Sequence, residues 1–223
     1  MGLFDKLFGP KPAPVVNDLR DTLFGDLPIG AWPPSDLTES PWTTFIAARN
    51  DLAAGNTATA VEKWLSITQL PDLESRHYVQ AWNFLLQHGQ TPPPEIAKTV
   101  YGVVVEVEMN GGLDLLAAYS DHSARYYNYS GAGVVWEHPD DSLDGPIDAL
   151  LAEAANVVAM IGPWDEPRRK TLTRGYVRLS FLTPSGLHFG EGPMVDMSRT
   201  GPGVAAMARA TQLMQALIAK SGR

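Results

Sequence analysis

The sequence predicts an α+β protein in which a stack of helices precedes a mainly antiparallel sheet flanked by two helices. Apolar residues recur at helical spacing over residues 43–87 and alternate with polar residues from residue 101 onward. Three consecutive prolines at 92–94 separate the two patterns. The 223 residues are therefore expected to comprise an irregular segment at 1–40, a helical unit at 41–92 and an α+β sheet domain at 98–223.

The amino-acid composition limits the classes of protein to which this chain can belong. Hydrophobic residues make up 44% of the chain and charged residues 19%, as in globular proteins, and no apolar run reaches the roughly 18–20 residues that a membrane-spanning helix needs. Stable membrane insertion is therefore not expected. The net charge of -8 disfavours binding to nucleic acid, and the basic cluster at 168–174 is short. The absence of cysteine excludes disulfides and thiol nucleophiles and favours a cytoplasmic location.

The first residues carry a short amphipathic pattern. A two-turn helix would place four apolar side chains on one face, namely Leu3, Phe4, Leu7 and Phe8. We expect this helix to dock on its own chain or to be disordered, with contact to a membrane surface as the alternative. Proline and glycine are frequent over residues 9–41, which predicts an irregular path across the protein surface.

Three helices are expected in the helical unit, starting at Ser40 or Thr43 and ending near residue 53, then over 57–68 and 73–87. The middle of this unit resembles the second half of a tetratricopeptide repeat. The residues that carry the resemblance lie within 55–71 and are Gly55, Asn56, Ala60, Trp64, Ile67 and Pro71. In that repeat a small residue lets two helices approach and an aromatic ring fills the gap, so the resemblance implies a packed helix pair.

The sheet domain is expected to have the order β-β-β-β-α-β-β-α. Strands are predicted at 101–109, 113–119, 124–129 and 133–137, and their short connections favour an antiparallel meander. A helix over 147–161, strands over 175–182 and 187–190, and a helix over 202–220 follow. Alternation assigns Glu106 and Glu108 of the first strand to an exposed sheet face.

An aromatic row on the third strand is the predicted partner-binding site. Arg125, Tyr127 and Tyr129 alternate onto one strand face, and Trp136 of the next strand lies alongside. Tyrosine, tryptophan and arginine are frequent interface anchors, which favours a non-catalytic protein-binding function, as in an adaptor or an inhibitor. Cross-strand pairing of these tyrosines within the sheet is the structural alternative.

A second hypothesis is a small-ligand-binding or hydrolase-like pocket near His188. The histidine would act as acid or base, Arg178 or Arg125 would hold an anion, and Glu191 would lie nearby. Gly190 and Gly192 would either admit a ligand or form turns. No catalytic residue is assigned from the sequence, and no cofactor is expected.

No metal site is expected, because the five histidines show neither HxH nor HExxH spacing. The acidic loop at 137–144 lacks the ligand spacing of a calcium loop. Asp121, His122 and Ser123 contain the groups of a catalytic triad, but adjacent residues point in different directions, so we interpret them as a turn.

Two stretches resemble segments of bacterial proteins without an assigned function. They are LDLLAAYSDHSARYYNYSGAGVVWE at 113–137 and RLSFLTPSGLHFGEGP at 178–193. The resemblance covers the C-terminal half of the chain and implies no mechanism.

Overall fold

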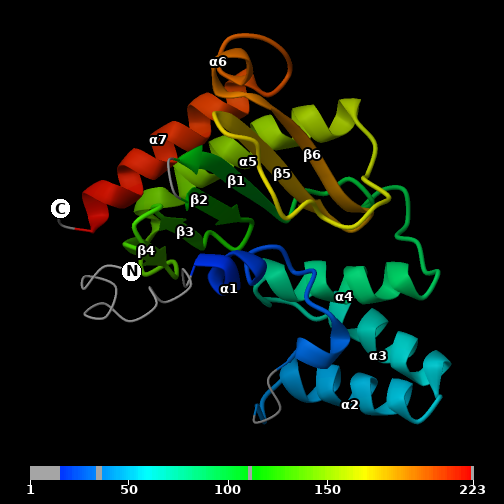
Figure 1. Ribbon diagram of the computed structural model, residues 1–223. Helices are drawn as coiled ribbons and strands as arrows, with labels where there is room; N and C mark the ends of the chain where they lie inside the picture. The colour runs from blue at the N-terminus through cyan, green and yellow to red at the C-terminus, as the bar shows by residue number, and fades with distance from the viewer. Residues whose placement is uncertain (1–15, 34–36, 110–111, 222–223) are drawn as a thin grey trace, which may run out of the picture.

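A six-stranded antiparallel sheet organises the fold, and the predicted α+β class is confirmed (Figure 1). The computed structural model describes residues 16–33, 37–109 and 112–221. The strand order is β4-β3-β2-β1-β5-β6, and consecutive strands pair except where β5 joins β1. The strands are β1 (Gly102–Met109), β2 (Gly112–Tyr119), β3 (Ala124–Tyr127), β4 (Gly133–Trp136), β5 (Tyr176–Thr183) and β6 (Gly186–Pro193).

The helices fall into three groups in Figure 1. The N-terminal group is α1 (Val16–Asp21) and the short 3-10 turn η2 (Ile29–Ala31), and the helical unit is α2 (Trp42–Ala53), α3 (Thr57–Thr68) and α4 (Ser75–Gln87). The C-terminal group is η3 (Asp141–Leu143), α5 (Asp144–Met160), α6 (Met194–Met197) and α7 (Val204–Lys220). The predicted helix over residues 3–8 lies outside the described residues. Within the described ranges, no helix is both long and apolar enough to cross a bilayer.

The helical unit has its own apolar core. Trp64 of α3 is fully buried, and its ring centroid lies 5.3 Å from that of Phe84 in α4. Gly55 forms the turn between α2 and α3 with a φ of 83°, a conformation that glycine adopts without steric cost. The three helices predicted from periodicity are confirmed, because each one buries an apolar face against the other two.

Helices α5 and α7 cover one face of the sheet, where the largest apolar core forms. Val103 and Val105 of β1, together with Phe181 of β5, point toward these helices. Lys98 precedes β1, and its ammonium donates hydrogen bonds to the carbonyls of Val158, Ala159 and Ile161 at the end of α5. A cation at this position offsets the partial negative charge of the helix C-terminus.

The opposite face of the sheet is also buried. Leu23 and Phe24, which follow α1, pack on this face beside Val104 and Tyr119, and the Tyr119 hydroxyl donates a 2.7 Å hydrogen bond to the Leu23 carbonyl. The expectation that Glu106 lies on an exposed face is therefore wrong, because its side chain is fully buried. Arg20 of the N-terminal segment contacts its carboxylate, and Arg178 of the neighbouring strand β5 contacts it from within the sheet.

Three buried charges and one partly buried carboxylate form a network beneath α1. Arg20 lies 2.5 Å from one Glu106 oxygen, and Arg178 lies 3.0 Å from the other. Arg178 also lies 2.7 Å from Glu191 and donates hydrogen bonds to carbonyls of the loop at 169–171. Each carboxylate therefore has a cationic partner, which a charge removed from water requires.

The C-terminal strand is longer than the sequence predicts. Gly190 and Gly192 lie inside β6, paired with Leu179 and Val177 of β5, so the interpretation of these glycines as turn residues is wrong. A Cβ atom at Gly192 would lie 3.3 Å from the side chain of Met197. The glycine therefore lets α6 lie close against the strand.

Alkaline pH is expected to destabilise the fold through Tyr119. Burial raises the pKa of this phenol above its ordinary value of about 10. Its stabilising contribution is then complete below about pH 10 and lost above it, because only the unfolded chain releases the proton. Between pH 9 and pH 11 the wild type should lose about 1 kcal/mol more than Tyr119→Phe in urea unfolding. Tyr129→Phe, which alters a half-exposed ring, should behave as wild type; equal losses in all three proteins would contradict the assignment.

Candidate functional site

The predicted aromatic row does not form one exposed surface. Arg125 pairs with Val135 and Trp136 pairs with Ala124, so the Arg125 and Trp136 side chains project to opposite faces of the sheet. Both side chains are buried, each in a residue only 7% exposed. The expected exposed platform is therefore wrong for these two residues.

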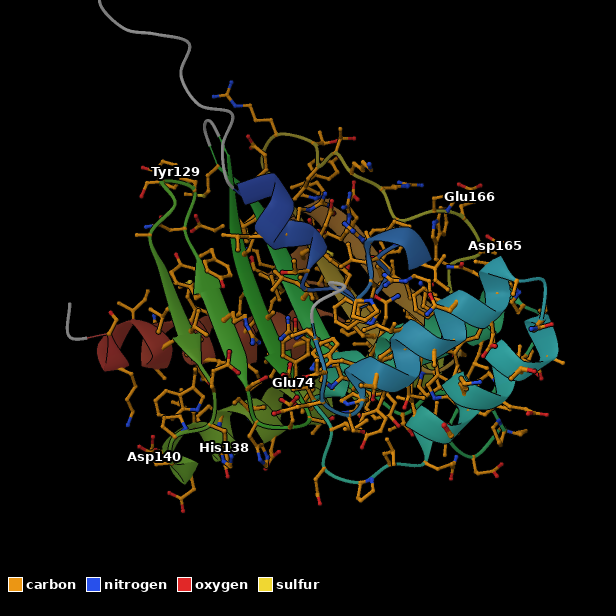
Figure 2. The ribbon with its side chains drawn as sticks, turned by 90° about the horizontal axis from the view of Figure 1, so that it is seen from below. Glu74, Tyr129, His138, Asp140, Asp165 and Glu166 are labelled. Carbon is orange, nitrogen blue, oxygen red and sulfur yellow. The ribbon has the colours of Figure 1, made fainter. Side chains whose placement is uncertain are left out.

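The two remaining members of the row are more accessible. Tyr127 is half-buried, and Tyr129 lies beyond the end of β3 with 50% of its surface exposed. Figure 2 shows Tyr129 at one end of β3 and β4 and His138 at the other end. The role of Tyr127 and Tyr129 in binding a partner stays a prediction.

The side chains predicted to form the alternative pocket near His188 do not lie together. His188 pairs with Phe181 and lies on the sheet face that packs in the largest core, whereas Glu191 pairs with Arg178 on the other face. His188 is fully buried, and burial lowers its pKa. Because Arg178 is held by Glu106 and Glu191, its guanidinium is not free to bind an anion.

An apolar groove of about 350 Å³ lies between the sheet and helices α6 and α7. Nine of its thirteen lining side chains are apolar. Val105 and Val107 of β1 form part of the floor, and Met194, Met207 and Met214 form part of the walls. Methionine side chains are flexible and polarizable, so they adapt to differently shaped apolar partners.

The polar groups that line the groove are satisfied within the protein. The Tyr126 hydroxyl donates to one oxygen of Asp114, and the backbone N–H of Tyr129 donates to the other. The hydroxyl of Ser198, just after α6, donates to the Val195 carbonyl, and the Thr211 hydroxyl donates to the Met207 carbonyl in α7. The groove therefore offers apolar contact without a hydrogen-bonding group that lacks a partner.

Tyr126 is a neutral hydrogen-bond donor at ordinary pH. Removal of its hydroxyl from water raises its pKa to about 12, and the hydrogen bond to Asp114 acts in the same direction. The carboxylate of Asp114 therefore keeps this hydrogen bond at ordinary pH, and it places one negative charge at the β2–β3 side of the groove.

The apolar stripe of α7, including Met207 and Met214, follows from sequence periodicity. The groove does not, because Met194 lies in its wall only through α6, a helix that no sequence pattern predicts.

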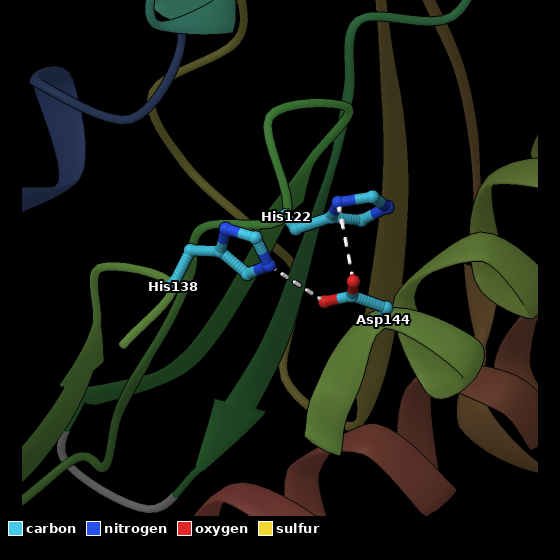
Figure 3. Close-up of side chains that lie close together, drawn as sticks. All are labelled: His122, His138 and Asp144. Carbon is cyan, nitrogen blue, oxygen red and sulfur yellow. Dashed lines mark ion pairs between the residues drawn. The ribbon is translucent and has the colours of Figure 1, made fainter. Parts of the chain in front are cut away.

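A second cluster lies at the opposite end of the sheet. His122, His138 and Asp144 place their ligand atoms within 4.8 Å of one another (Figure 3). The Asp121 carboxylate accepts a hydrogen bond from the backbone N–H of Ser123, which confirms the predicted turn and directs His122 toward α5. No sequence pattern predicts this cluster, because its members come from three separate segments of the chain.

Comparisons of the chain with models of protein families, with curated proteins and with solved structures find no match.

Proposed function

We propose that this protein is a non-catalytic adaptor or inhibitor that binds a partner protein through the apolar groove between α7 and β1–β3. The observation that carries the proposal is the combination of an apolar lining with polar groups that are already paired. Binding in the groove is favourable because it removes apolar surface of the occupant and of the groove from water.

The occupant that fits this chemistry is an amphipathic segment of the partner. Small-molecule sites usually contain a few free polar groups that fix the orientation of the ligand, and the paired groups of this groove supply none. An amphipathic helix instead places apolar side chains at i, i+3, i+4 and i+7 into a groove. Val195 of α6, which is 56% exposed, extends the apolar surface from Met194 toward solvent.

Charge favours a basic partner. The chain carries a net charge of -8, and complementary charge accelerates the encounter of two proteins. Lysine or arginine beside the apolar face of the docked segment would then lie against the rim of an acidic protein, while the apolar face enters the groove.

The test uses a fluorescent helical peptide with leucine at i, i+3, i+4 and i+7 and lysine elsewhere, together with a peptide of the same composition in scrambled order. Fluorescence anisotropy should show at least tenfold tighter binding of the patterned peptide, equivalent to about 1.4 kcal/mol. Ala208→Trp adds an indole at the groove and should remove that preference.

The matched control is Ala205→Trp, which makes the same change at an exposed position of α7 outside the groove lining. This variant should bind as wild type does. Equal affinity for the two peptides, or equal loss in the two tryptophan variants, would show that the groove does not carry the binding. Deletion of residues 1–15 provides a further arm, because stronger peptide binding after deletion would identify the chain's own N-terminal segment as a competing occupant.

A further inference from the structure

We infer that His122, His138 and Asp144 form a binding site for a divalent transition-metal ion, with Zn²⁺ as the best fit. His138 Nε2 lies 3.0 Å from Asp144 Oδ1, and His122 Nδ1 lies 3.7 Å from Asp144 Oδ2. Two ligands of one tetrahedral zinc ion lie roughly 3.3 Å apart, given bonds of about 2.0–2.1 Å. The three side chains are therefore already near the spacing that a shared ion requires.

Asp144 carries an observation that an ordinary ion pair does not explain. Its Oδ1 atom is buried and accepts no hydrogen bond from any described residue, although His138 Nε2 is only 3.0 Å away. The two atoms are close, but their orientation is not that of a donor and an acceptor. Such an arrangement is expected when both atoms direct a lone pair at the same cation.

The orientation of His122 is fixed from its far side. Its Nε2 atom lies 3.0 Å from Asp148 Oδ1, one turn after Asp144 on α5. If Nε2 donates its proton to this carboxylate, Nδ1 carries the lone pair that faces Asp144. Carboxylate support of a histidine ligand is the common outer arrangement of protein zinc sites.

The backbone holds both histidines in an uncommon conformation. His122 has a φ of 61° and His138 a φ of 51°, in the left-handed region. Among the described residues only Asp72 is a further non-glycine residue with positive φ. Backbone strain of this kind tends to cluster at functional sites. Here it turns the two imidazoles toward the first residue of α5.

The chemistry of the three groups selects the class of ion. Imidazole nitrogen suits zinc and its transition-metal neighbours, whereas Ca²⁺ and Mg²⁺ prefer oxygen ligands. Three protein ligands leave one position of a tetrahedron open. His138 also lines a cleft of about 580 Å³ that contains Glu74, Asp121 and Glu137, and Glu74 and Glu137 are ion-paired with Arg76 and Arg125.

Isothermal titration calorimetry of the full chain with ZnCl₂ at neutral pH tests the site, because it measures both affinity and stoichiometry. We expect one Zn²⁺ per chain in wild type, with affinity lowered about 100-fold or more in His122→Gln, His138→Gln and Asp144→Asn. Asp148→Asn, which removes only the support of His122, should lower the affinity about 10-fold. Asp141→Asn changes an exposed carboxylate of the same loop and should leave binding unchanged.

Co²⁺ binding to wild type supplies a readout that does not depend on any variant. A tetrahedral site gives strong visible absorption, and the band should disappear when Zn²⁺ displaces Co²⁺. The site would be overturned by a weak octahedral spectrum, by a stoichiometry well below one, or by a loss in Asp141→Asn equal to that in Asp144→Asn.

Discussion

Replacing Glu106 with glutamine should lower the free energy of unfolding by about 3–5 kcal/mol, the cost of breaking a buried ion pair from one side. Glu106 is fully buried and holds Arg20 and Arg178 through separate carboxylate oxygens. Glutamine has nearly the same shape but no charge, so the Arg20 guanidinium would stay buried without an anion. Urea unfolding followed by circular dichroism measures the loss.

Glu108→Gln is the matched control, because it makes the same change two residues further along β1. The Glu108 carboxylate is only partly buried and accepts one hydrogen bond, from the backbone N–H of Gly175. Its replacement should cost about 1 kcal/mol or less. Similar losses in the two variants would mean that the Arg20–Glu106–Arg178 network does not contribute in the way proposed. Hydrogen exchange should also accelerate in α1 of Glu106→Gln, since Arg20 connects this helix to the sheet.

Trp64→Ala should destabilise the protein by about 3–5 kcal/mol, as expected when a fully buried aromatic side chain is removed. The indole fills the space between α3 and α4, with its centroid 5.3 Å from Phe84 and 5.2 Å from His88. The surrounding helices are too closely packed to close the resulting cavity fully. Urea unfolding again provides the measurement.

Two further variants separate cavity formation from other effects. Trp64→Phe keeps most of the ring and should cost less than Trp64→Ala, because the indole Nε1 has no hydrogen-bond partner among the described residues. Leu65→Ala alters the adjacent residue, which is 37% exposed, and should cost about 1 kcal/mol or less. If Leu65→Ala and Trp64→Ala had the same effect, helix propensity and not core packing would determine the stability of this unit.

The groove and the histidine cluster occupy opposite ends of the sheet. Asp114 and Tyr126 border the groove near the beginning of β2, whereas His122 follows the end of β2. A metal ion at the second position would join the β2–β3 turn, the segment after β4 and the start of α5. Both sites therefore depend on how α5 and α7 lie across the same sheet face.

The sequence by itself determined the class of fold and the order of its elements. Periods of about 3.6 and 2 residues are local properties of the chain, and they identified the helical unit, the four-strand meander and the two helices that cover the sheet. The third strand was predicted to end at Tyr129, whereas β3 ends at Tyr127, which is a small difference in its boundary. These features were predictable because each element shows its own apolar pattern.

Only the tertiary structure decided which polar residues are buried and which meet. Periodicity identified the residues that share a strand face, but a segment far along the chain decides whether that face is covered. Arg20 covers Glu106, and the turn of His122 meets His138 and Asp144 only after the sheet has formed. The free energy that holds these groups together comes from contacts between segments that are distant in the sequence. A local pattern of residues therefore cannot predict it.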